Sequence, residues 1–86
     1  MKMSAKKRRG DVYDLVSYNI KKYRKSIGIT QAQLAERCQL SHEYIRRIEA
    51  PNIKKHHFSL ETVSIIADAL NIEVVQLFDK IEEDEV

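Results

Sequence analysis

The 86-residue sequence contains only two glycines, one proline and one cysteine, and each scarcity excludes a class of protein. Two glycines and one proline are too few for the tight turns of a β-rich fold. The single cysteine, Cys38, cannot form an internal disulfide and fits a reducing compartment. No apolar run approaches the roughly 18 residues of a membrane-spanning helix, and residues 1–10 lack the apolar core of a signal peptide. We therefore expect one small cytoplasmic domain.

The sequence also lacks the patterns that would indicate catalysis or a bound cofactor. It contains no glycine-rich phosphate loop and no plausible nucleophile–base pair. His56 and His57 are adjacent, but no cysteine, acid or further histidine stands at metal-ligand spacing from them. Cys38 is interpreted as a small buried helix side chain, because a redox sensor needs an exposed thiol with a lowered pKa. We expect neither an enzyme nor a metal or cofactor site.

Charge is present in quantity, and it is unevenly distributed. Residues 1–58 carry 14 of the 15 lysines and arginines against five acids, a local charge of +9. Residues 59–86 carry Lys80 against eight acids, a local charge of −7, so the two parts sum to the net +2 of the chain. Such polarity favours a basic face that binds a polyanion, although a solvated surface with sorted charges is the alternative.

Helical periodicity begins after a basic N-terminal arm at residues 1–10. Between Val12 and Ile27 the apolar residues recur at steps of three and four, which predicts one long amphipathic helix. Four basic residues are assigned to its other side: Lys21, Lys22, Arg24 and Lys25. Gly28 suits the left-handed residue that follows a helix end, because it has no Cβ to clash there.

Three further helix starts share one pattern, in which a hydroxyl residue is flanked by hydrophobes at the staple positions. The hydroxyl residues are Thr30, Ser41 and Ser59. They predict helices over about 31–38, 42–49 and 60–70. Ten hydrophobic side chains of these helices are expected to form one core with the first helix: Leu34, Ala35, Cys38, Ile45, Ile48, Leu60, Val63, Ile66, Ala67 and Leu70.

A fifth helix is predicted over about 74–82, followed by an acidic frayed tail at 83–86. Its start is the least defined, because Glu73 is a poor N-cap. With no period-two segment and no hairpin turn, the fold class is all-α, a five-helix bundle forming a single domain over residues 11–82.

The connection between the helices at 31–38 and 42–49 is short enough to predict a helix-turn-helix. The second of these helices buries Ile45 and Ile48, and it therefore turns its polar residues outwards. Arginine can pair with guanine, glutamate can accept from cytosine, and histidine can do either. We therefore expect this helix to face duplex DNA. The outward residues are His42, Glu43, Arg46 and Arg47.

Three segments carry a resemblance to a known family: "IKKYRKSIGITQAQLAERC", "LSHEYIRRIE" and "SLETVSIIADALNI" followed by "VVQLF". Together, over Leu15–Phe78, they resemble the XRE-type helix-turn-helix regulators, which include the lambdoid phage repressors. The resemblance implies a domain of the lambda-repressor type. It also implies that Glu49 is structural and that Gln31 grips a backbone phosphate and braces the recognition helix.

Further site residues follow from the same resemblance. It implies base contacts from four residues, with Arg46 at the margin of the site: His42, Glu43, Arg46 and Arg47. It implies phosphate contacts from Gln31, Ser41, Tyr44, Lys54, Lys55 and His57. The chain departs from the family at the turn, where Gln39 replaces the usual glycine, and after the recognition helix, where Pro51 replaces another. An alternative reading is that Glu43 simply holds Arg46 or Arg47 in an ion pair.

The predicted function is sequence-specific binding of double-stranded DNA by a transcriptional regulator that acts as a repressor. Because one such domain makes few contacts, we expect a homodimer on a palindromic operator. The candidate dimer residues, which alternatively close the core of the single chain, are Val75, Leu77, Phe78 and Ile81. The rival interpretation is a helical protein–protein adaptor, such as an antitoxin-type or polymerase-binding module, whose basic face docks an acidic protein partner.

Overall fold

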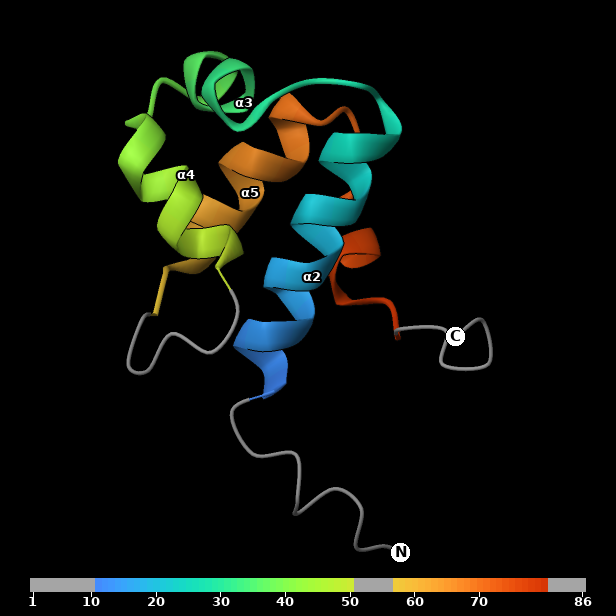
Figure 1. Cartoon of the computed structure of the whole chain (residues 1–86). Coiled ribbons are helices and arrows are strands. Elements are labelled where there is room, and N and C mark those ends of the chain that lie inside the picture. The colour runs from blue at the N-terminus through green and yellow to red at the C-terminus, as the bar shows by residue number, and fades with distance from the viewer. Residues whose placement is uncertain (1–10, 51–56, 81–86) are drawn as a thin grey trace, which may run out of the picture.

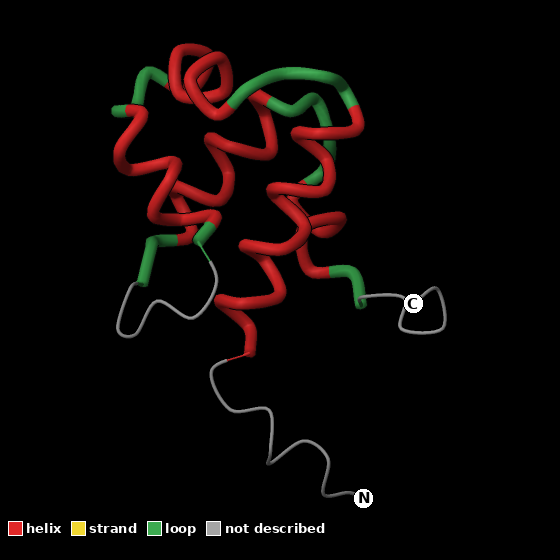
Figure 2. The backbone as a smooth tube through the Cα atoms, in the orientation of Figure 1, coloured by secondary structure: helices red, strands yellow, loops and turns green. Residues whose placement is uncertain are grey.

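The computed structural model describes residues 11–50 and 57–80, and the regular structure in both ranges is helical (Figure 1, Figure 2). The elements are α2 (Asp11–Ser26), α3 (Gln31–Cys38), α4 (His42–Glu49), α5 (Leu60–Ala69) and the 3-10 helix η1 (Val74–Phe78). In these ranges none of the helices combines the length and the apolar character that crossing a membrane requires. The all-α prediction is confirmed, and the bounds of α3 and α4 match the prediction.

Three of the helices begin at the hydroxyl caps that the sequence predicts. The side-chain oxygens of Thr30, Ser41 and Ser59 accept hydrogen bonds from backbone N–H groups in the first turns of α3, α4 and α5, at 3.0, 3.0 and 3.1 Å. At Thr30 the backbone N–H also donates to Gln33 Oε1 at 2.8 Å, which completes the capping box. Each cap contributes about 1 kcal/mol, so the helix starts follow from local sequence.

The turn between α3 and α4 is closed by Gln39 in a left-handed conformation, with φ of 60° and ψ of 39°. Its backbone N–H donates to Glu36 O at 3.2 Å, and the N–H of Leu40 donates to Ala35 O at 2.9 Å. This pair of bonds is the Schellman arrangement, which satisfies carbonyls at a helix end. Gly28, after α2, also has a positive φ of 75°, as predicted.

The core is formed by side chains from all five elements. The buried hydrophobic residues are Val16, Ile20, Leu34, Ala35, Cys38, Ile45, Ile48, Val63, Ile66, Ala67, Leu70 and Leu77. Leu60 does not belong to it, because 74% of its surface is exposed. The prediction for Leu60 is wrong because this residue is the first of α5 and lies one turn before Val63, where burial begins. Val12 and Ile27, at the ends of the predicted stripe on α2, are also exposed.

The predicted fifth α-helix over 74–82 is replaced by the shorter η1. Backbone bonds of the i to i+3 type form here, from Gln76 N to Glu73 O and from Asp79 N to Gln76 O. The amide of Asn19 on α2, which is fully buried, donates from Nδ2 to Leu77 O and Asp79 O at 2.9 Å each. η1 ends at Phe78, and Asp79 is extended. The two bonds from Asn19 attach this end of η1 to α2.

The packing leaves one side of α4 at the surface. α4 contacts α3 and α2, α5 packs on α3, and η1 lies against α2 and α5 (Figure 1). The α3–α4 pair, drawn in green and yellow-green, therefore forms a corner of the molecule, with α5 lying behind it in this view.

Candidate nucleic-acid interface

Helix α4 has a buried side and an exposed side, as its sequence period predicts. Ile45 and Ile48 are 0% and 1% exposed, and Glu49 is also buried. The side chains at the remaining outer positions, which the sequence predicts to face DNA, are all exposed: His42, Glu43, Arg46 and Arg47. A helix held by one side and polar on the other can present these groups to a ligand without disturbing the core.

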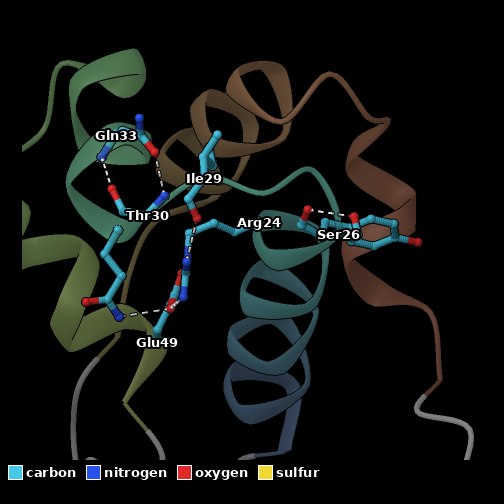
Figure 3. A network of polar contacts seen from close by, with 8 residues as sticks. Arg24, Ser26, Ile29, Thr30, Gln33 and Glu49 are labelled. Carbon is cyan, nitrogen blue, oxygen red and sulfur yellow. Dashed lines mark hydrogen bonds and ion pairs between the residues drawn. The ribbon is translucent and has the colours of Figure 1, made fainter.

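A buried ion pair fixes the C-terminal end of α4. Arg24 of α2 donates from Nε to Glu49 Oε2 at 2.7 Å and from Nη2 to Glu49 Oε1 at 2.9 Å, and the two side chains are 9% and 1% exposed (Figure 3). Arg24 Nη1 also donates to Ile29 O at 2.7 Å, in the loop that leads to α3. One guanidinium therefore ties α2, this loop and the end of α4 together, in the bidentate geometry that arginine favours.

The assignment of Arg24 to the outer side of the first helix is wrong. Arg24 follows Ile20 by four residues and Val16 by eight, so it continues the buried stripe of α2. The spacing of Arg24 from Val16 and Ile20 indicated a buried position. A buried arginine, however, needs an acidic partner, and here that partner is Glu49 of α4, which the spacing within α2 does not reveal. The structural role that the family resemblance implies for Glu49 is confirmed by its burial and its pairing with Arg24.

Gln31, the first residue of α3, also contacts Glu49. Its Nε2 donates to Glu49 Oε1 at 3.0 Å, and its side chain is only partly buried. This contact accounts for the bracing of the recognition helix that the resemblance implies. The phosphate contact of Gln31 remains a prediction.

Glu43 and Arg46 form an ion pair on the exposed side of α4. Arg46 donates from Nε to Glu43 Oε1 at 3.1 Å and from Nη2 to Glu43 Oε2 at 2.7 Å. The hydrogen bond from Arg46 lowers the pKa of the Glu43 carboxyl, and Glu43 in turn raises the pKa of Arg46. Of the two arginines that the sequence offered as partners for Glu43, Arg46 is the one engaged.

Arg47 also lies on the exposed side of α4 and differs from Arg46 in its contacts. Among the described residues, no hydrogen bond or ion pair engages its side chain, and the same holds for His42 at the start of the helix. Ser41 is exposed and caps α4 through Tyr44 N, which confirms its structural role. Tyr44 is partly buried against the core.

The other predicted phosphate residues, Lys54, Lys55 and His57, precede α5 in the sequence. Lys54 and Lys55 fall outside the described residues. The His57 ring is stacked on Tyr13 of α2, with centroids 4.4 Å apart and planes at 21°, and Tyr13 also meets Phe58 edge-on at 5.2 Å. His57 is exposed to solvent, and its ring packs against the ring of Tyr13.

The candidate dimer residues separate into different environments. Leu77 is 0% exposed and packs in the core of the single chain, so it cannot lie on a surface between two chains. Phe78 is partly buried, whereas Val75 is 67% exposed. Ile81 lies outside the described residues. Among the described members of this set, Val75 is therefore the most exposed.

Cys38 is buried, and burial raises the pKa of its thiol. The cysteine therefore behaves as the small helix side chain that the sequence predicts. Within residues 11–50 and 57–80, no group of three or more histidine, cysteine or acidic side chains is placed to hold a metal ion.

Comparisons with known proteins agree with this geometry. The model of the helix-turn-helix family HTH_3 matches residues 20–77. The control protein C.SmaI of Serratia marcescens is 33% identical over 70 residues, which cover 81% of this chain and 80% of that protein. The crystal structure of the hypothetical transcription factor NHTF from Neisseria superposes with a TM-score of 0.76 at 27% identity, covering 87% of this chain and 83% of the other.

The matched residues run from the middle of α2 to η1, so they include both helices of the motif, the turn at Gln39 and the Arg24–Glu49 pair. This is the region whose motifs carry the resemblance noted in the sequence. The family is not enzymatic. The chain therefore belongs to the XRE-type helix-turn-helix family of DNA-binding transcriptional regulators.

Proposed function

We propose that this chain is a repressor that binds a specific operator in double-stranded DNA by inserting α4 into the major groove. The observation that carries the proposal is the division of α4 into an anchored side and a polar exposed side. Ile45, Ile48 and Glu49 hold the helix, while Arg47 and His42 project from it without a hydrogen-bonding partner among the described residues. Such groups can bind base edges, because binding requires no internal bond to be broken.

The helix-turn-helix geometry supports groove insertion. A recognition helix contacts base edges with its N-terminal residues while the preceding helix crosses the backbone. In this chain the start of α3 carries Gln31 and the start of α4 carries Ser41, both at the surface or only partly buried. These positions suit phosphate contacts that set the register of α4, and their N–H groups suit an anion.

A single α4 offers few base contacts, so we propose that two chains bind a palindromic operator. Half-sites would then be centred about one helical turn, ~34 Å, apart. The exposed Val75 on η1 supports a surface between the two chains. A regulatory role is supported by the relative named a control protein and by the structural neighbour titled a hypothetical transcription factor. The proposed site of action is the cytoplasm.

The test is a selection of bound oligonucleotides from a random duplex pool, followed by substitution of Arg47. We expect an enriched inverted repeat. Because a bidentate contact with guanine is worth about 1–3 kcal/mol, Arg47→Ala should weaken binding to the selected site by that amount and relax the preference at one base pair. Fluorescence anisotropy with single-base variants of the site measures both effects.

Gln31→Ala provides the comparison, because loss of a phosphate contact should weaken all sequences to a similar extent. The proposed reading of DNA by α4 is wrong if operator discrimination survives loss of His42, Glu43 and Arg47 together. If the pool yields no enriched sequence and the chain instead captures an acidic protein through its basic face, the adaptor interpretation replaces the regulator.

A further inference from the structure

The Glu43–Arg46 pair occupies the part of α4 that would meet the bases. The residues are three apart on one helix, so their side chains lie on the same side, and their exposures of 57% and 58% place both at the surface. Both carboxylate oxygens accept from the guanidinium, through Nε and Nη2. Arg46 and Glu43 therefore present one hydrogen-bonded unit to a ligand.

The pairing changes what Arg46 can offer to DNA. A guanidinium has five N–H donors in a fixed fork, and two of its nitrogens here point to Glu43. Nη1 and the outer hydrogen of Nη2 remain for a base or a phosphate. The two hydrogen bonds favour one orientation of the side chain, so less conformational freedom is lost when it meets a matching base edge.

The charge of Glu43 adds a second effect. Phosphates repel a carboxylate, so an acid on this surface opposes close approach to any duplex that provides no compensating donor. An arginine released from Glu43 would be a general phosphate ligand, but its release would leave the carboxylate unpaired against the polyanion. A duplex that leaves the pair intact avoids this penalty.

We propose that Glu43 is a specificity-determining residue that acts through Arg46, by aiming its guanidinium and by preventing it from serving as a general phosphate contact. The inference rests on the proposed function, because it assumes that α4 reads DNA. In this inference Arg46 contacts a base, and Glu43 increases the preference for the operator over other duplexes. An ion pair that only stabilised the helix would have neither effect. Exposed ion pairs of this spacing stabilise helices only slightly, so the pair contributes little to the stability of α4.

The experiment compares wild type with Glu43→Gln on the selected operator and on unrelated duplex, over a range of salt concentrations. Glu43→Gln keeps the shape and removes the charge. We expect binding to unrelated duplex to strengthen and its salt dependence to steepen by about 0.9 in the logarithmic slope, as one more cation contacts phosphate. The ratio of operator to unrelated affinity should fall about tenfold, within the usual range for one base contact.

The matched control is Glu61→Gln. Glu61 is also exposed and also lies in the first turn of its helix, α5, so the substitution changes net charge and helix position in the same way. We expect it to alter general attraction to DNA but to leave base preference unchanged. A second variant, Arg46→Gln, should remove the same base preference as Glu43→Gln, and the double variant should lose no more than either alone.

The outcomes separate the two proposals. If wild type shows no preferred duplex, the proposed function fails. If wild type selects an operator while Glu43→Gln matches Glu61→Gln in base preference, the proposed function stands and the role of Glu43 is overturned. Circular dichroism of each variant checks that α4 remains folded, so a loss of discrimination reports on recognition.

Discussion

Arg24 and Glu49 show at the residue scale how much the position of α4 depends on one contact. Arg24→Met would leave the Glu49 carboxylate buried without its ionic partner. Because breaking a buried pair from one side usually costs about 3–5 kcal/mol, we expect a loss of that size. The midpoint of urea unfolding measures it, and the loss is a large part of the roughly 5–15 kcal/mol that stabilises a typical domain.

The double variant Arg24→Met/Glu49→Met tests the cause. Apolar residues in place of both charges should recover most of the stability, because no buried charge is left unpaired. Gln31, which is partly exposed, can then turn its amide to water. A double variant as unstable as Arg24→Met alone would show that the loss has another origin, such as the missing contact with Ile29 O.

The turn between α3 and α4 illustrates the element scale, because a non-glycine residue closes it. A left-handed backbone costs roughly 1–2 kcal/mol for most residues, whereas glycine adopts it freely but loses more entropy on folding. We therefore expect Gln39→Gly to raise the free energy of unfolding by about 0.5–1 kcal/mol. Thermal or urea unfolding measures the gain, and affinity for duplex DNA should not change.

Asn71→Gly is the control for this substitution. Asn71 follows α5 and has a similar positive φ of 62°. Asparagine tolerates the left-handed region better than glutamine does, so its replacement should change stability less. Equal gains at both positions would indicate a general effect of glycine and contradict the argument from Gln39.

The helix starts could be predicted from sequence because their causes are local. Thr30, Ser41 and Ser59 each cap the helix that follows them, using atoms three residues away. The outward positions of α4 were predictable for the same reason, since Ile45 and Ile48 define its buried side. Local hydrogen bonds and helical periodicity therefore account for most of the motif.

The parts that could not be predicted depend on distant residues. Asn19 donates hydrogen bonds to Leu77 O and Asp79 O across 58 and 60 positions of sequence, at the end of the segment that forms η1 instead of the predicted α-helix. Arg24 finds Glu49 across 25 positions, which turns a residue assigned to the surface into a buried one. The spacing of apolar residues in the sequence predicts on which side of its helix a residue lies. It does not predict which residue of another element will pack against that side.

At the scale of the whole molecule, the proposed dimer can be tested on η1. Val75→Asp should keep the fold, because Val75 is 67% exposed, but it should place a charge in the proposed surface between chains. We expect a monomer in sedimentation experiments. Affinity for the full palindrome should fall by about 10²-fold, because the second half-site then binds without the benefit of linkage.

Ile27→Asp is the corresponding control, since Ile27 is an exposed hydrophobic residue that lies outside η1. It should remain dimeric. A Val75→Asp variant that still sediments as a dimer would remove η1 from the interface, and a monomeric wild type bound to its operator would contradict the dimer itself.

The division of α4 into a buried and an exposed side has a consequence for engineering its proposed DNA specificity. Within the described residues, the side chains of the four outward positions hydrogen-bond only among themselves, whereas Ile45, Ile48 and Glu49 carry the attachment to the rest of the chain. The residues proposed to read DNA are therefore different residues from those that attach α4 to the rest of the fold. If α4 reads DNA as proposed, a library randomised at residues 42, 43, 46 and 47 should yield folded variants that prefer different duplex sequences.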